Sequence, residues 1–147
     1  MKRLYASREI AASPDFVFRT VSDVRNFQNA VSHIIHVEFL SDQHCGVGTR
    51  FRETRLVNGR EQTVEIEVAE LVDNKRVRMI SDAGGTIWDS LFTVSVNSPT
   101  ITLGMTMEIQ PYKMVAKLIT PLISGLVLKG VEADMDAVKV YCESKCP

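Results

Sequence analysis

This chain has few cysteines and no large excess of charge of either sign. Three cysteines occur in 147 residues (Cys45, Cys142 and Cys146), an odd number without paired spacing. That pattern is typical of free thiols in a reducing compartment rather than of a disulfide framework. The net charge at pH 7 is −1, so the composition gives no preference for nucleic acid or for an anionic membrane as a partner.

Long hydrophobic runs are also missing. The longest apolar stretch, 114–128, contains Lys117 and Pro121 and is shorter than a membrane span requires. The first residues are charged and alternate with apolar ones, which is not the pattern of a secretory signal. We therefore expect a cytoplasmic protein without integral membrane insertion.

Motifs that hold phosphates, nucleotides or metals are absent too. There is no Gly-x-Gly-x-x-Gly, no phosphate loop and no Gly-x-Ser-x-Gly turn. Gly46-Val-Gly48 precedes a strand-like segment, so it lacks the helix N-terminus that would hold a phosphate. His33 and His36 point to opposite faces of an extended segment, and His44 lies in a loop. The sequence predicts no metal site and no cofactor.

What the chain does contain is a clear order of elements within one expected domain, 1–147. Its length and its hydrophobic content of 45% suffice for one core. Ser13-Pro14-Asp15 predicts a helix start, with a capping hydroxyl, a proline suited to the first position and an acid that complements the dipole. A second short helix is expected over 23–31, with Asp23 as its cap.

Between these short helices and the C-terminus, the chain reads as a series of strands. Apolar and polar residues alternate, and turn sequences such as Asn58-Gly59 and Gly84-Gly85 separate the segments. Consecutive strands joined by tight turns pair antiparallel. Together with the first strand, the expected strands are 2–10, 34–40, 48–57, 61–72, 76–81, 86–96 and 101–110. The sequence thus predicts an α+β fold with one curved antiparallel sheet.

A long apolar helix is expected to close the chain, from about 112 to 145. Its first half, 114–127, is apolar nearly all round, and Pro121 is expected to kink or break it near Thr120. This helix is the element able to cover the concave face of the sheet, and a sheet that grips one helix leaves room for a cavity. The second half carries one apolar stripe: Leu128, Val131, Met135, Val138 and Cys142.

The third strand, 48–57, does not reveal which of its faces is buried. Its even-numbered residues share one face and its odd-numbered residues the other, and neither set is wholly apolar. If the odd-numbered face points inward, Glu53 and Arg55 must pair with each other or with a ligand. If it points outward, they form cross-strand pairs with Glu65 and Glu67 in water.

The expected cavity draws its lining from several strands and from the first half of the long helix. Matched alternation places Trp88 and Phe92 on the same face as Met105 and Met107. Methionines fill irregular space and adapt to varied ligands. The predicted lining is Phe51, Glu53, Arg55, Met79, Trp88, Ser90, Phe92, Met105, Met107, Leu118 and Leu122.

Other polar side chains have less definite roles. Asn29 is a further candidate for the cavity, and Tyr5 or Tyr112 would supply a hydroxyl group. Asp89 lies on the face opposite Trp88 and is expected in solvent. Acid–base chemistry can be argued only for Glu53, Arg55 and Ser90, and we assign no catalytic residue from the sequence.

Several segments together resemble one known superfamily. They are Ile10-x-Ala-Ser-Pro-Asp-x-Val-Phe18, Ser22-Asp-Val-x-x-Phe27, Gly46-Val-Gly-Thr-Arg-Phe51, Asp82-Ala-Gly-Gly-Thr-x-Trp-Asp89 and Met135-Asp-Ala-Val-Lys-Val-Tyr-Cys-Glu143. They resemble the START-related polyketide cyclase/dehydrase and lipid-transport superfamily, whose fold is the helix-grip of the major birch pollen allergen. The resemblance implies a curved sheet of about seven strands around a C-terminal helix. Its members bind lipids, quinones, hormones and flavonoids or cyclise polyketides, without a shared set of catalytic residues.

Three functions remain open at this point. A carrier or sensor would enclose a small hydrophobic molecule, such as a lipid, a quinone or a polyketide-like compound, in a cavity lined by carbon. An aromatase/cyclase or dehydratase-type enzyme would need a paired polar cluster inside. A protein-interaction module would have a filled core and would use 114–127 to bind a partner or a second copy as a homodimer. For a cavity, we expect the entrance between the loop 42–48 and the helix segment 120–125, the weakest segments.

Overall fold

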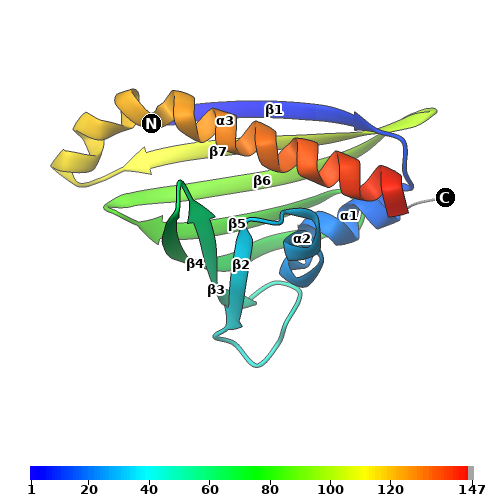
Figure 1. Cartoon of the computed structure of the whole chain (residues 1–147), viewed down its shortest axis with the longest axis horizontal. Coiled ribbons are helices and arrows are strands. Elements are labelled where there is room, and N and C mark those ends of the chain that lie inside the picture. Colours follow the sequence, from blue (N-terminus) through cyan, green and yellow to red (C-terminus); the bar gives the residue numbers. More distant parts are fainter. Residues whose placement is uncertain (146–147) are drawn as a thin grey trace.

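The computed structural model describes residues 1–145 and shows an α+β helix-grip fold: a curved antiparallel sheet, two short helices after the first strand and a long C-terminal helix (Figure 1). The strands are β1 (Lys2–Ile10), β2 (Ile34–Phe39), β3 (Arg50–Val57), β4 (Arg60–Val72), β5 (Arg76–Ala83), β6 (Thr86–Asn97) and β7 (Thr100–Pro111). The helices are α1 (Pro14–Ser22), α2 (Val24–Ala30) and α3 (Met114–Lys145).

The two short helices begin where their capping residues predict. The Ser13 hydroxyl accepts a hydrogen bond from the backbone N–H of Phe16, and Pro14 takes the first position of α1. The Asp23 carboxylate accepts from the N–H of Arg25 at the start of α2 and is paired with the Arg25 guanidinium. Burial would raise the pKa of Asp23, but these hydrogen bonds outweigh it and lower the pKa.

The seven strands form one sheet in the order β1-β7-β6-β5-β4-β3-β2, and every neighbouring pair is antiparallel. The order follows the chain except for β1, which pairs with β7 and brings the start of the sheet beside its last strand. Asn58 and Gly59 both have positive φ, as a two-residue turn between β3 and β4 requires. The inner face therefore carries Trp88, Ser90 and Phe92 opposite Ile109, Met107 and Met105.

The second half of α3 fastens the helix to the sheet and to the short helices. Its predicted stripe is buried at Val131, Met135, Val138 and Cys142, and half-buried at Leu128. Polar contacts add to this packing at the edge strand: Arg8 of β1 donates to Asp136 over 2.6 Å, and Glu143 accepts from the N–H of Ala11.

The first half of α3 departs from the expectation in two ways. The helix continues unbroken through Pro121, although its first turns run in a different direction from the rest (Figure 1). Most of its large apolar side chains are exposed, whereas Ala116 and Thr120 are buried. Neither Cys45 nor Cys142 takes part in a disulfide within residues 1–145, and Cys146 lies outside the described residues.

Candidate functional site

A pocket of about 380 Å³ lies between the inner face of the sheet, the two short helices and the second half of α3. Strands β3 to β7 form its floor, Val21, Val24 and Phe27 close one end, and α3 contributes Val127, Gly130, Val131 and Asp134. The volume lies within the range of small-molecule sites, and most of the lining side chains are apolar or aromatic, as such sites are.

Nine of the predicted cavity residues line this pocket: Phe51, Glu53, Arg55, Met79, Trp88, Ser90, Phe92, Met105 and Met107. The prediction is wrong for the other two, because Leu118 and Leu122 are 68% and 80% exposed. The buried side of this half of the helix is marked by Ala116 and Thr120. A residue two positions further along a helix points to nearly the opposite side, which places Leu118 and Leu122 away from the sheet.

The structure resolves the ambiguity of β3: its odd-numbered face points inward. Phe51 and Glu53 are buried, and both line the pocket together with Arg55. The even-numbered arginines make the exposed pairs, Arg50 with Glu65 of β4 and Arg52 with Glu38 of β2. The alternative in which Glu53 and Arg55 pair with β4 in water is therefore excluded.

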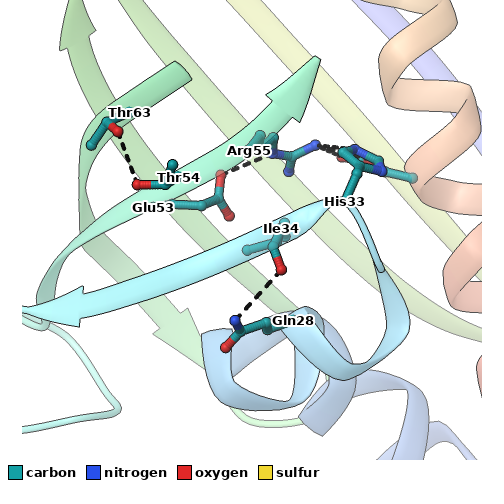
Figure 2. A network of polar contacts seen from close by, with 8 residues as sticks. Gln28, His33, Ile34, Glu53, Thr54, Arg55 and Thr63 are labelled. Atoms are coloured by element: carbon teal, nitrogen blue, oxygen red, sulfur yellow. Dashed lines mark hydrogen bonds and ion pairs between the residues drawn. The ribbon is translucent and has the colours of Figure 1, made fainter. Parts of the chain in front are cut away.

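Arg55 is the centre of a polar network at one side of the pocket (Figure 2). Its Nε donates to Glu53 Oε2 over 3.0 Å, and its Nη1 donates to both oxygens of Asp134, over 2.9 and 3.1 Å. The same nitrogen lies 3.2 Å from His33 Nε2. Side-chain exposure rises from 6% at Glu53 through 15% at Asp134 and 25% at Arg55 to 41% at His33, so the network runs from the interior to solvent.

The charges of this network hold Arg55 in its ionised form. Burial would lower the pKa of Arg55, but the nearby charges of Glu53 and Asp134 and their hydrogen bonds outweigh burial and raise it. Neither Arg55 Nη2 nor Glu53 Oε1 has a hydrogen-bond partner among the described residues. The network thus retains donors on one residue and an acceptor on the other.

Two members of the network, His33 and Asp134, were not among the predicted site residues. Asp134 directly precedes Met135 and lies three positions after Val131, so it borders the buried stripe of α3. An acidic residue at the edge of an apolar stripe was the one signal for it. No local pattern predicted a partner for His33, because its contact with Arg55 depends on the turn between α2 and β2.

The structure also places three other polar residues that were considered from the sequence. Asp89 is not in solvent but buried, and it accepts two hydrogen bonds from Arg78 over 2.8 and 2.7 Å. Asn29 is exposed and does not line the pocket. Tyr112 is half exposed, and its hydroxyl donates to Asp82, which raises the pKa of Tyr112.

The open side of the pocket does not lie where the sequence suggested. Neither the loop 42–48 nor the segment 114–126 contributes a lining residue in the described part of the chain. The exposed lining residues are Gln62 of β4 and Gly130 of α3. The pocket therefore reaches solvent between α3 and the β3–β4 hairpin. Within residues 1–145, no group of three or more His, Cys, Asp or Glu side chains is placed to hold a metal ion.

Comparisons with known proteins agree with this architecture. A family model described as polyketide cyclase / dehydrase and lipid transport matches residues 1–143. No curated protein matches the chain. Among solved structures, a START superfamily protein from Mycobacterium smegmatis has a TM-score of 0.78 at 14% identity, covering 97% of each chain.

Two further solved structures have the same fold. The structure of Ara h 8.0201 has a TM-score of 0.78 at 11% identity and covers 98% of this chain and 99% of that one. A truncated norcoclaurine synthase from Thalictrum flavum has a TM-score of 0.74 at 16% identity and covers 94% and 91%. At such identities these likenesses establish the fold and leave the activity open.

Proposed function

The chain belongs to the polyketide cyclase / dehydrase and lipid transport family, and from that membership we propose that it binds or carries a small hydrophobic molecule between its sheet and α3. The observation that carries the proposal is the pocket itself. A site of about 380 Å³ with a mostly apolar lining and a few convergent polar groups is the usual form of a small-molecule site.

The arrangement of the lining supports a ligand with an apolar body and one polar end. Met79 on β5 and Met105 and Met107 on β7 offer an adaptable apolar wall, and the Arg55 network lies on β3 and α3. A carbonyl or hydroxyl oxygen on the ligand would accept from Arg55 Nη2, and a hydroxyl would donate to Glu53 Oε1. The apolar contacts would supply most of the affinity and the polar contacts the orientation.

A cyclase or dehydratase-type activity is the second candidate, and the buried Glu53 carboxylate is the observation that favours it. Such an enzyme needs a group in the pocket that takes a proton from its substrate. The carboxylates of the network are already engaged by Arg55, which suits a fixed anchor for a ligand better than a proton acceptor. Once a ligand is identified, conversion of that ligand by wild type but not by Glu53→Gln would favour the enzyme.

Native mass spectrometry of the purified protein tests the binding proposal. Ser90→Phe adds a ring to a side chain in the pocket and should exclude the ligand. Ser95→Phe makes the same change on the exposed outer face of β6 and serves as the matched control. We expect a bound molecule of a few hundred daltons on wild type and on Ser95→Phe, and none on Ser90→Phe.

Two results would contradict the proposal. One is a bound molecule that Ser90→Phe retains at wild-type occupancy while circular dichroism shows a folded protein. The other is the absence of any bound molecule on wild type together with no binding of the apolar probe 8-anilinonaphthalene-1-sulfonate.

A further inference from the structure

The first half of α3 exposes an apolar face that its fold leaves uncovered. Six large apolar side chains there are between 41% and 80% exposed: Met114, Val115, Leu118, Ile119, Leu122 and Leu126. Their spacing of three and four residues gathers them on the side of the helix that is turned away from the sheet. We call these six residues the apolar face of α3.

This face contributes little to the packing of the domain, because its six side chains are between 41% and 80% exposed. The inward side of the same turns consists of Ala116 and Thr120, and the second half of the helix supplies the buried stripe. Contiguous apolar surface in water is unfavourable, and exposed patches of this kind mark surfaces that meet a partner or a membrane. The face lies at the end of the molecule opposite α1 and α2 (Figure 1).

The charges around the apolar face have one sign, although the whole chain is nearly neutral. Between Glu108 and Glu132 the sequence contains Lys113, Lys117 and Lys129 and no acidic residue. No ion pair engages any of these three lysines in the described part of the chain. The arginines of the molecule, by contrast, are nearly all paired with carboxylates, so these lysines are cations available to an external anion.

We propose that the apolar face of α3 docks on the surface of an anionic phospholipid bilayer. A helix with exposed leucines on one side and lysines beside them lies in the interface between headgroups and acyl chains. Each lysine near such a surface adds attraction to anionic lipid, and each leucine adds buried apolar area.

The helix lies on the bilayer rather than crossing it. By length and composition α3 is apolar enough to span a membrane. Its second half, however, is held in the core by Val131, Met135 and Val138, and Asp136 is paired with Arg8 of β1. Spanning would require this half to leave the sheet, whereas docking uses only the side chains that are already exposed.

A second copy of the chain fits the same face less well. A two-fold dimer would place this face against itself, because both subunits contribute the same patch. Within 109–131 the only charged residues are Lys113, Lys117 and Lys129, so a two-fold contact through this segment would bring like charges together. An anionic lipid surface supplies the opposite charge that the patch lacks.

Docking would bring the pocket close to the bilayer. Val127 directly follows Leu126 of the apolar face and lines the pocket, and Gly130 is one of the exposed lining residues on the open side. A hydrophobic ligand would then pass between lipid and pocket with little exposure to water. This consequence rests on the proposed function, whereas docking itself does not.

Co-sedimentation with vesicles tests the proposal directly. The probes are vesicles of phosphatidylcholine alone and vesicles of phosphatidylcholine with phosphatidylglycerol, at low and at high salt. The variant Leu118→Ser with Leu122→Ser removes two exposed leucines, and Val140→Ser is the control because Val140, on the second half of α3, is as exposed as Leu118. Circular dichroism and thermal unfolding establish that each variant folds.

We expect wild type and Val140→Ser to bind the anionic vesicles and to be released by salt. The partition coefficient should fall about tenfold for each leucine removed, and about fivefold for each lysine changed in Lys113→Gln and Lys117→Gln. The double leucine variant should keep its bound small molecule in native mass spectrometry, since neither leucine lines the pocket.

Three outcomes would overturn the proposal. Wild type that does not bind anionic vesicles at low salt is one, and a folded double leucine variant that binds as well as wild type is another. The third is a dimer of wild type, seen by sedimentation velocity, that the leucine substitutions dissolve while vesicle binding is absent. Vesicle binding by a protein that carries no small molecule and does not bind 8-anilinonaphthalene-1-sulfonate would instead remove the proposed function and leave docking intact.

Discussion

Arg55 on β3 and Asp134 on α3 are 79 positions apart in the chain and meet beside the pocket, with Arg55 Nη1 2.9 Å from Asp134 Oδ2. This contact joins the sheet to the helix on the side where the pocket reaches solvent. Because Arg55 also holds Glu53, the same residue fixes the helix and orients the polar group that a ligand would meet.

Replacing Asp134 by asparagine should destabilise the domain. The substitution removes the negative charge that faces Arg55 and weakens the hydrogen bonds between α3 and β3. Hydrogen bonds to charged groups contribute about 1.5–3 kcal/mol each, so we expect the free energy of unfolding to fall by about 1–3 kcal/mol. Equilibrium unfolding in urea measures this change.

Asp136→Asn provides the matched control on the same helix. Asp136 is 61% exposed and pairs with Arg8, and pairs of this kind contribute about 0–1 kcal/mol. If the two variants lose the same free energy of unfolding, the contact beside the pocket stabilises the protein no more than an exposed ion pair does.

Acid should destabilise the protein partly through Glu9 of β1. This carboxylate accepts hydrogen bonds from Thr102, then Thr100 and Asn97, which lower the pKa of Glu9. A lowered pKa in the folded state means that the contribution is fully present above the ordinary glutamate pKa of about 4.3 and is lost as pH falls through the folded value. Glu9→Gln should therefore lose less stability than wild type below about pH 4.

The check for Glu9 is urea unfolding at a series of acidic pH values. Glu61→Gln serves as the control, because Glu61 is exposed and makes no side-chain hydrogen bond or ion pair in the described part of the chain. If the free energy of unfolding changes with pH in the same way for Glu9→Gln and wild type, the hydrogen bonds to Glu9 do not stabilise the protein in the pH-dependent way predicted here.

Alanine should have opposite effects at two glycines. In the interior of α3, a methyl group added at Gly125 meets no atom within 4 Å, so Gly125→Ala should stabilise the protein by about 0.5–1 kcal/mol. In β7, a methyl group at Gly104 would lie 2.7 Å from Thr93 Oγ1 and 3.3 Å from the Tyr5 hydroxyl, so Gly104→Ala should destabilise it by about 1–3 kcal/mol. Thermal unfolding measures the change in stability of each variant. A stabilising Gly104→Ala would contradict the packing of Tyr5 over β7.

The sequence predicted those parts of the fold that depend on neighbouring residues. Ser13 and Asp23 cap the short helices because a side-chain oxygen next to a free backbone N–H forms a local hydrogen bond. The Asn58-Gly59 turn sets the pairing of β3 with β4, and alternation then assigns the inner face of β6 and β7. Most of the pocket lining follows from these local rules.

The errors concern interactions between segments far apart in the chain. Leu118 and Leu122 were assigned to the cavity because the first half of α3 is apolar on all sides, so hydrophobicity alone did not select the face that meets the sheet. Asp89 was assigned to solvent, but Arg78 on β5 covers it. Asp134 and His33 join the site only through Arg55, and no local pattern records such a contact.

Nuclear magnetic resonance of the methionine methyl groups tests the central claim most directly. Met79, Met105 and Met107 line the pocket, Met1 and Met114 are exposed, and Met135 is buried in the core. On titration with 8-anilinonaphthalene-1-sulfonate, we predict saturable shifts for the three pocket methyl groups and none for Met1. Shifts confined to Met1 and Met114, or no saturable shift at the pocket methyl groups, would contradict the account.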